Sequence, residues 1–141
     1  MKTLKLFIAL VFPLGLFAQG ITKPADQRKD YTIGNCVNEF TTGKIESTAV
    51  GYQYWFVDRN FLDGRTVKMS VVRPHEATHP PHRHAEDEIF FVLEGKAEFF
   101  LNGKTRVAQP YTSFYCPPNS LHGIRNAGSD TLKYLVIKKY E

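Results

Sequence analysis

Short strand-like stretches separated by turn-forming residues recur along most of this 141-residue chain and restrict the folds open to it. The strongest cue is Asn102-Gly103, a dipeptide typical of two-residue hairpin turns, which lies between EFFL and KTRV. Asp63-Gly64 and Glu94-Gly95 are also flanked by strand-like residues. No long window after residue 20 shows helical periodicity. The pattern therefore predicts an all-β domain: a sandwich, a jelly roll or a small barrel.

Seven strands are expected from apolar-polar alternation and from aromatic and β-branched content. Their ranges are 51–57, 67–73, 88–93, 97–101, 105–108, 112–116 and 132–138. No repeat, charge block or low-complexity run interrupts residues 21–141, so we expect one domain there. Residues 21–64 are assigned to a lead-in and N-terminal strands, and residues 65–141 to the barrel that carries the functional residues.

The first twenty residues match the pattern of a signal peptide. Two lysines precede the mostly apolar run 6–18, and small residues that suit signal peptidase follow it. This run, interrupted by Pro13 and Gly15, is too short for a membrane span, which needs about 20 residues, and no other run is long enough. We expect an exported protein, periplasmic or secreted, without a membrane span. A buried N-terminal helix is the alternative, and cleavage after Ala18 or after Gly20 stays open.

The net charge does not favour a nucleic-acid partner. The formal charge is +4 and becomes +2 without Lys2 and Lys5 of the leader. This basic excess is too small to indicate nucleic-acid binding.

The two cysteines, Cys36 and Cys116, are interpreted through export, because an oxidising compartment permits a disulfide. Their separation in sequence gives no geometric support for or against a bond, so a disulfide and two buried free thiols both stay open. Neither has the closely grouped neighbours of a structural zinc site.

Four of the five histidines lie in the run RPHEATHPPHRHAEDEIFFVLEG. On a strand, His82, His84 and Glu88 project to one face if the pleat continues through residues 85–87. On a helix, His82 and His84 would point about 200° apart. Pro80-Pro81 also disfavours a helix. A strand at this position is therefore the conformation that suits a metal.

A fourth ligand is available from His122, which follows the rigid Pro117-Pro118 turn. Three neutral imidazoles and one carboxylate leave one or two positions open on a five- or six-coordinate ion.

The histidine run resembles the first sequence motif of the cupins. That motif reads Gly, five residues, His-x-His, three or four residues, Glu, six residues, Gly. His82, His84, Glu88 and Gly95 match it, whereas Glu76 stands at its opening Gly.

The segment CPPNSLHGIRNAG is similar to the second cupin motif, which reads Gly, five residues, Pro-x-Gly, two residues, His, three residues, Asn. Pro117, His122 and Asn126 match, whereas Tyr111 and Asn119 occupy the two Gly positions. Asn tolerates a left-handed backbone, so that departure is mild. The Tyr111 and Glu76 departures affect turns and not ligands.

The resemblance covers about residues 65–140 and implies a double-stranded β-helix, the jelly-roll barrel of the cupins. It implies one divalent transition-metal ion, zinc, manganese, nickel, iron or copper, held by His82, His84, Glu88 and His122. A homodimer is open, because many cupins are dimers. The alternative for the four residues is a barrel that keeps them without a metal.

Candidate ligand-contacting residues surround this predicted site. Phe90 and Val92 share the parity of Glu88 and should face the barrel interior. Tyr54, with Tyr52, Trp55 and Tyr115, is a further candidate, with core packing as the favoured alternative. Arg73 is a weak candidate for binding a carboxylate, and Arg125 is expected to point outward.

The remaining polar residues of the two motifs have simpler interpretations. His75 and His79 fall outside the ligand spacing and are expected to be exposed, with a role at the cavity mouth as the alternative. Glu86 and Asp87 are expected to be solvated turn acids, with a role as a base beside the metal ligands as the alternative. Asn126 is expected to pin a turn through backbone hydrogen bonds.

Three functions fit these residues. The first is a metal-dependent isomerase, epimerase or lyase for a small polar metabolite such as a sugar or sugar acid, with Glu88 as the catalytic group that moves a proton. The second is an iron- or copper-dependent dioxygenase with the same ligands. The third is a non-catalytic module that binds a small ligand.

Overall fold

The computed structural model describes residues 31–140, and the chain from Ile33 onward is one compact unit. The expected signal peptide, residues 1–20, lies outside the described residues. The elements are α1 (Ile33–Cys36), the 3-10 turn η1 (Thr42–Lys44), β1 (Glu46–Thr48), β2 (Gly51–Leu62), β3 (Arg65–Val72), β4 (Glu88–Glu94), β5 (Ala97–Leu101), β6 (Lys104–Ala108), β7 (Ser113–Cys116), β8 (His122–Asn126) and β9 (Leu132–Lys139).

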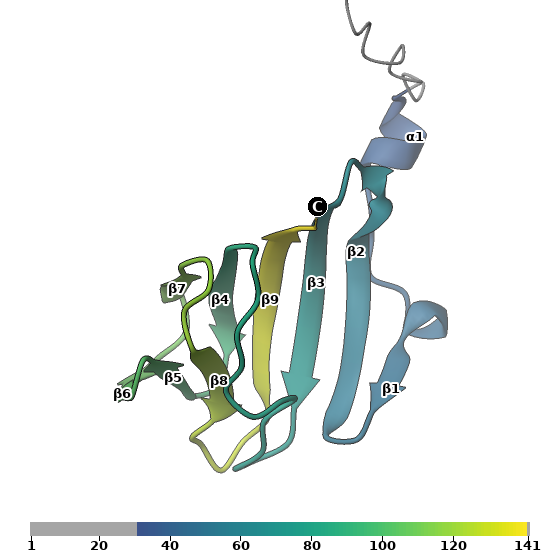
Figure 1. Cartoon of the computed structure of the whole chain (residues 1–141). Coiled ribbons are helices and arrows are strands. Elements are labelled where there is room, and N and C mark those ends of the chain that lie inside the picture. The colour runs from purple at the N-terminus through teal and green to yellow at the C-terminus, as the bar shows by residue number, and fades with distance from the viewer. Residues whose placement is uncertain (1–30, 141) are drawn as a thin grey trace, which may run out of the picture. The chain divides into compact units, whose positions relative to one another are not determined.

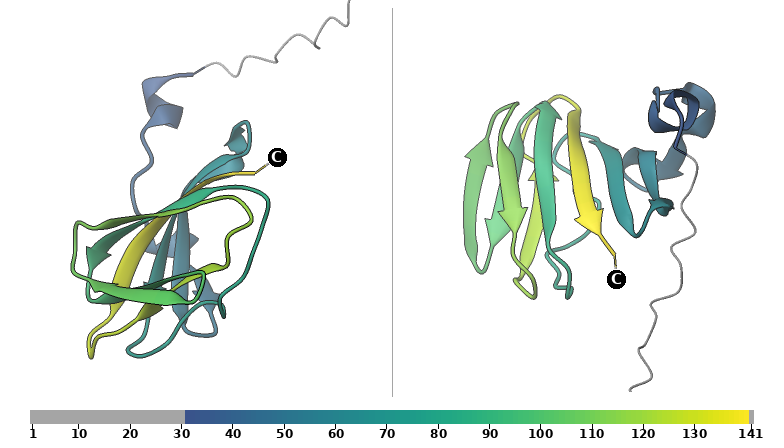
Figure 2. Two further views of the ribbon diagram at one scale, coloured as in Figure 1. Left: turned by 60° about the vertical axis from the view of Figure 1, so that its left-hand side comes forward. Right: turned by 90° about the horizontal axis from the view of Figure 1, so that it is seen from above.

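These strands form two antiparallel sheets that pack against each other (Figures 1 and 2). The larger sheet has the order β1-β2-β3-β9-β4-β7, and the smaller has the order β6-β5-β8. Some neighbours in the larger sheet are distant in sequence, since β9 lies between β3 and β4. This arrangement confirms the predicted all-β jelly-roll class.

All seven expected strands are present, and two further strands, β1 and β8, were not predicted. The predicted Asn102-Gly103 turn joins β5 to β6, with Leu101 paired to Lys104. Both turn residues have positive φ angles, 46° and 87°, which is the left-handed backbone that an Asn-Gly hairpin turn requires.

The main hydrophobic core lies between the two sheets. Its members are Val72, Phe90, Val92, Ala97, Phe99, Cys116, Ile124, Leu132, Tyr134 and Val136. The rings of Phe99 on β5 and Phe114 on β7 lie 4.7 Å apart and join the smaller sheet to the larger. Burial of these side chains is the main force that holds the two sheets together.

A second apolar cluster covers the other face of β2 and β3. It consists of Tyr54, Met69 and Val71, with partly buried neighbours. Because side chains alternate along a strand, Lys68, Ser70 and their even-numbered neighbours on β3 face the smaller sheet, while Met69 and Val71 face away. This alternation determines which residues of the large sheet surround the functional site.

Cys36 is exposed and Cys116 is buried, and both are free thiols. Of the two arrangements that the sequence left open, the structure has neither a disulfide nor two buried thiols. None of the helices within residues 31–140 has the length and apolar character that a membrane crossing requires.

Candidate metal centre

Four side chains from three parts of the chain meet between the two sheets. His82 and His84 come from the connection between β3 and β4, Glu88 is the first residue of β4, and His122 is the first residue of β8. One donor atom from each lies within 4.8 Å of all the others. The three residues selected by spacing and the fourth candidate, His122, are therefore brought together.

The backbone reaches this arrangement by a different path from the predicted one. Convergence was expected if the pleat continued through residues 85–87, but β4 begins at Glu88, as the predicted range 88–93 does, and His82 makes an isolated antiparallel bridge to His122. The intervening chain bends at residues 85–86, where the Glu86 carbonyl accepts a hydrogen bond from His84 Nδ1 at 2.7 Å. The condition of a continuous pleat is not met, and the side chains converge through this bend, whose side-chain bond competes with strand pairing.

All three imidazoles are oriented by the same kind of contact. The Nδ1 atoms of His82, His84 and His122 lie 3.3, 2.7 and 2.8 Å from the backbone carbonyl oxygens of residues 80, 86 and 120. A carbonyl only accepts, so each Nδ1 carries a proton. In a neutral imidazole this leaves the Nε2 lone pair for the interior of the cluster, as in metal-binding histidines.

The donor set fits a metal ion. Glu88 Oε1 lies 2.9 Å from His122 Nε2 and 3.6 Å from His84 Nε2. His84 Nε2 is buried and has no hydrogen-bond partner among the described residues. The lone pairs of these nitrogen and oxygen atoms repel one another unless a cation lies between them. A proton on His122 Nε2 would satisfy its contact with Glu88 but would leave His84 Nε2 without a donor. A divalent cation satisfies all four donors, and imidazole with carboxylate suits a transition metal.

Burial and nearby groups distinguish the four ligand candidates. His122 is fully buried and Glu88 is 6% exposed, whereas His82 and His84 are more accessible.

The carboxylate of Glu86 lies 3.5 Å from His84 Nδ1 and 3.4 Å from Lys138 Nζ. The hydrogen bond from its own backbone N–H, followed by the Lys138 charge, holds the pKa of Glu86 below its usual value. Glu86 thus supports His84 as an anion and is not merely a solvated turn acid.

Two of the candidate ligand-contacting residues lie on the inner face, at different depths. The Phe90 ring is 6.3 Å from the His122 ring, so Phe90 forms an apolar wall of the site. Val92 is fully buried in the main core and lies four residues beyond Glu88, about 13 Å along the strand. Val92 therefore packs the core below the site.

The structure does not bring Tyr54 and Arg73 to the cluster. Tyr54 lies in the second apolar cluster on the opposite face of the sheet, and its hydroxyl donates to the Glu39 carbonyl at 2.7 Å. Arg73 is 57% exposed and bonds to the Ala49 carbonyl and to Glu76. It follows Val72, whose carbonyl binds Asn126 at the far end of β8 from His122. Both residues have structural contacts in place of the predicted ligand contacts.

The second-motif residues behave as their chemistry predicts. Asn126 donates to the carbonyls of Val72 and Asp130 and accepts from the Gly128 N–H, so it pins the β8–β9 turn. Arg125 points outward, with Nε 2.6 Å from Glu98. Asn119 and Tyr111, at the two Gly positions of the motif, have φ angles of 59° and 63°. The two turns thus keep a left-handed backbone without glycine.

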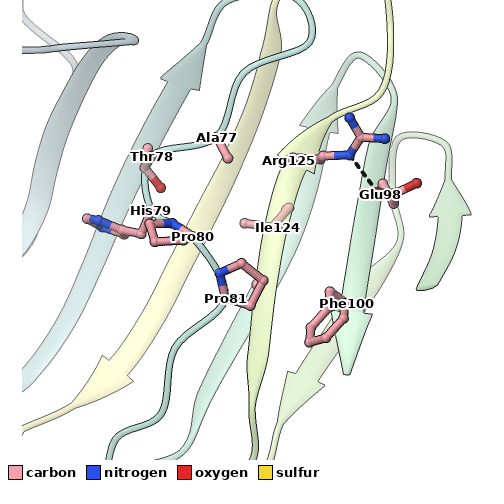
Figure 3. A pocket seen from close by; sticks show the side chains of 10 residues that line it. Ala77, Thr78, His79, Pro80, Pro81, Glu98, Phe100, Ile124 and Arg125 are labelled. Atoms are coloured by element: carbon pink, nitrogen blue, oxygen red, sulfur yellow. Dashed lines mark hydrogen bonds and ion pairs between the residues drawn. The ribbon is translucent and has the colours of Figure 1, made fainter. Parts of the chain in front are cut away.

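A cavity of about 260 Å³ lies apart from the metal cluster (Figure 3). Outward-facing Glu98, Phe100 and Arg125 of β5 and β8 line one side, and residues 77–81 line the other. The His79 ring points away from Phe100 and Arg125 (Figure 3) and lies 5.6 Å from the His82 ring. His79 is exposed, as the sequence predicted, and it lines this cavity beside the ligand candidate His82.

Lys68 is a further neighbour of the site that sequence reasoning missed. Its side chain lies on the inner face of β3, and its charge reaches both Glu88 and His79. The sequence does show that Lys68 shares a strand face with Thr66, Ser70 and Val72, because all four positions are even-numbered. It does not show which face of β3 is turned toward the ligand candidates, because this depends on pairing with β9.

Comparison with known proteins identifies relatives of this fold. A family model described as "Cupin domain" matches residues 68–138, half of the chain. No curated protein sequence matches the chain.

Solved structures resemble the fold at low sequence identity. The polyketide cyclase RemF from Streptomyces resistomycificus has 21% identity and a TM-score of 0.61, over 74% of this chain and 80% of its own. A predicted oxalate decarboxylase from Thermotoga maritima has 19% identity and a TM-score of 0.59, over 64% and 80%. A sugar phosphate isomerase from Silicibacter pomeroyi has 18% identity and a TM-score of 0.59, over 64% and 59%. At these identities the similarity shows the fold and not the reaction.

Proposed function

This chain belongs to the cupin domain family, and from that premise we propose that it is a metal-dependent enzyme that isomerises, epimerises or cleaves a small polar metabolite such as a sugar or sugar acid. One observation carries the proposal: three imidazoles, each held through Nδ1, converge with Glu88, and the buried His84 Nε2 has no hydrogen-bond partner within residues 31–140.

The residues that would hold the metal are His82, His84, Glu88 and His122. A bound divalent ion supplies Lewis-acid polarisation of a substrate carbonyl or hydroxyl oxygen. Zinc, manganese, nickel, iron and copper are all compatible with this donor set.

The chain's own residues would then orient the substrate and move a proton. The Phe90 ring excludes water from the wall beside His122. Glu88 Oε1 faces the histidines, while Oε2 makes no hydrogen bond to a described residue. Oε2 is therefore the atom assigned to exchange a proton with a substrate carbon or oxygen. Isomerases, epimerases and lyases all need electron density to be withdrawn from the substrate and a proton to be moved, and this site would supply both functions.

Elemental mass spectrometry of the purified protein tests the metal. We expect about one equivalent in the wild type and loss of it in His84→Ala. His75→Asn is the matched control, because His75 is exposed, lies outside the cluster and has a left-handed backbone (φ 64°) that Asn tolerates. Absence of metal from the wild type, even after reconstitution, would remove the proposal.

A substrate panel tests the reaction. Sugars, sugar acids and sugar phosphates are incubated with the metal-loaded protein, and products are followed by NMR. Metal-dependent turnover that is lost in His84→Ala supports the proposal. Oxygen uptake with bound iron or copper would favour a dioxygenase, and tight binding without turnover would favour a binding module.

A further inference from the structure

Beyond the four ligand candidates, the inner face of the large sheet carries two lysines. Pairing places Glu88, Lys138 and Thr66 in one row across β4, β9 and β3, and places Phe90, Val136 and Lys68 in the next. Directly paired residues project to the same side of a sheet. Both ammonium groups therefore face the layer that holds the metal cluster.

The two lysines differ in how their charges are compensated. Lys138 is 9% exposed and is paired with Glu86 at 3.4 Å, with its Nζ 4.7 Å from the centre of the Tyr140 ring. Lys68 is partly buried, yet it makes no ion pair or hydrogen bond with any described residue. Its one specific contact is with Trp55, whose ring centre lies 5.1 Å from Nζ. Because no described carboxylate pairs with it, the Lys68 ammonium is available to an anion from outside the chain.

Glu88 and Glu46 are the carboxylates whose charges act on Lys68, but neither forms an ion pair with it. Burial lowers the pKa of Lys68, and the charges of Glu88 and Glu46 oppose that shift. Glu46 Oε2 is occupied, since it accepts from Gln53 Nε2 at 2.7 Å and from Trp55 Nε1 at 3.1 Å. Glu88 faces the histidines, and a metal there would compensate its charge. Among the described residues on this face, no carboxylate then compensates the charge of Lys68.

The position of Lys68 is also open to a ligand. Lys68 is only partly buried, and the main core through which the two sheets pack reaches β3 at Val72 and does not include Lys68. The side chain of Lys68 projects with those of Val136 and Phe90 from the inner face of the large sheet, where the Phe90 ring lies 6.3 Å from the His122 ring. Lys68 thus projects from the same face of the sheet as the ligand candidate Glu88.

We propose that Lys68 binds an anionic group, a carboxylate or a phosphate, of the substrate whose oxygen atoms meet the metal cluster. This inference rests on the proposed function, because it assigns a substrate class to the same site. It makes the substrate an acid or a phosphate ester and not a neutral sugar. Trp55 supports the site by holding the Lys68 side chain against its ring.

Isothermal titration with three sugars that share one scaffold tests this assignment: glucose, glucuronate and glucose 6-phosphate. The purified protein is titrated in metal-loaded and metal-free form. We expect one or both anions to bind at least 10-fold more tightly than glucose to the loaded wild type. Which anion binds more tightly distinguishes a carboxylate from a phosphate. Equal affinities for all three sugars, or no binding of either anion, would overturn the inference.

Variants of Lys68 separate this inference from the proposed function. Lys68→Met should weaken anion binding about 10- to 100-fold, since a charge-assisted contact is lost, and should keep the metal content of the wild type. Lys68→Arg should restore most of the affinity. Lys104→Met, on an exposed residue of β6, is the matched control and should bind as the wild type does.

The outcomes are distinguishable. Wild-type anion affinity in Lys68→Met, with folding verified by circular dichroism and metal content intact, would overturn the inference and leave the proposed function standing. If the wild type lacks metal, the proposed function fails, and the metal-free titrations still show whether Lys68 binds the anion. If Lys68→Met does not fold, Lys68→Gln is measured in its place and judged by the same criteria.

Discussion

Asn126 shows how one buried amide connects three parts of the chain. Its side chain is fully buried and bonds to Val72 at the end of β3, to Asp130 and to Gly128. We expect Asn126→Ala to lower the free energy of unfolding by about 2–4 kcal/mol, because buried carbonyls lose their donors. Urea denaturation measures this, with exposed Ser129→Ala as the control. A change as small as that of the control would contradict the assignment.

The two cysteines should differ in reactivity at the same scale. Burial and the Glu88 charge raise the pKa of the Cys116 thiol, which disfavours the reactive thiolate, whereas Cys36 is exposed. An aromatic disulfide reagent should therefore titrate one thiol in the native protein and two in denaturant. Cys36→Ser should remove the native reaction. If no thiol reacts in denaturant without reductant, the cysteines are bonded and this prediction is wrong.

At the scale of elements, the turns after β4 and β5 offer a matched comparison. Gly95 and Gly103 both have positive φ angles, 85° and 87°. A Cβ on Gly103 meets nothing within 4 Å, whereas one on Gly95 would lie 2.6 Å from the Thr131 carbonyl oxygen. Gly103→Ala should cost about 1–2 kcal/mol for the left-handed backbone alone. Gly95→Ala should cost more, because the neighbouring backbone must also move.

Urea denaturation of both variants checks this comparison. Equal losses of stability would mean that the chain at Thr131 moves freely, contrary to its contact with Gly95. The β4–β5 turn would then not constrain the start of β9.

The elements that local chemistry specifies are those that the sequence predicted. The β5–β6 hairpin was predicted because Asn102-Gly103 carries its turn signal locally. Strand β8 was missed because HGIRN contains a glycine and lacks clear alternation, and it forms through pairing with β5 and a bridge to His82. The four ligand candidates were predicted by type and spacing. The bend at residues 85–86 was not, because it depends on a contact between His84 and the Glu86 backbone.

Residues that act through distant pairing could not be placed in advance. Tyr54 was expected near a ligand but packs on the opposite face, since the register with β3 sets its orientation. Lys68 drew no attention because a lysine in a strand normally reaches solvent. Only the β3–β9–β4 pairing shows that it projects from the same face as Glu88.

At the scale of the whole molecule, export is a prediction that the described residues do not test. The basic start and the apolar run of residues 6–18 support a cleaved signal peptide. Expression of the full chain in a bacterium, followed by N-terminal sequencing of the periplasmic fraction, should give a mature start after Ala18 or after Gly20. An intact N-terminus in the cytoplasmic fraction would contradict it.

Metal binding should stabilise the fold as a whole, because the ligand candidates join both sheets. Glu88 belongs to the larger sheet, His122 to the smaller one, and His82 and His84 to the connection that bridges them. Unfolding separates all four, so an ion that binds only the native state stabilises it by about 2.7 kcal/mol at 100 times its dissociation constant. For a domain of this size the melting temperature should rise by on the order of 10 °C.

Differential scanning calorimetry with added zinc, manganese or nickel measures this rise, and a chelator should reverse it. His84→Ala should lose most of the rise, whereas His75→Asn should keep it, because only His84 contributes a donor to the cluster. If both variants keep the full rise, the ion binds elsewhere. If His84→Ala instead melts higher than the metal-free wild type, crowding of the four donors destabilises the empty site, and the same metal titration measures how far a bound cation relieves it.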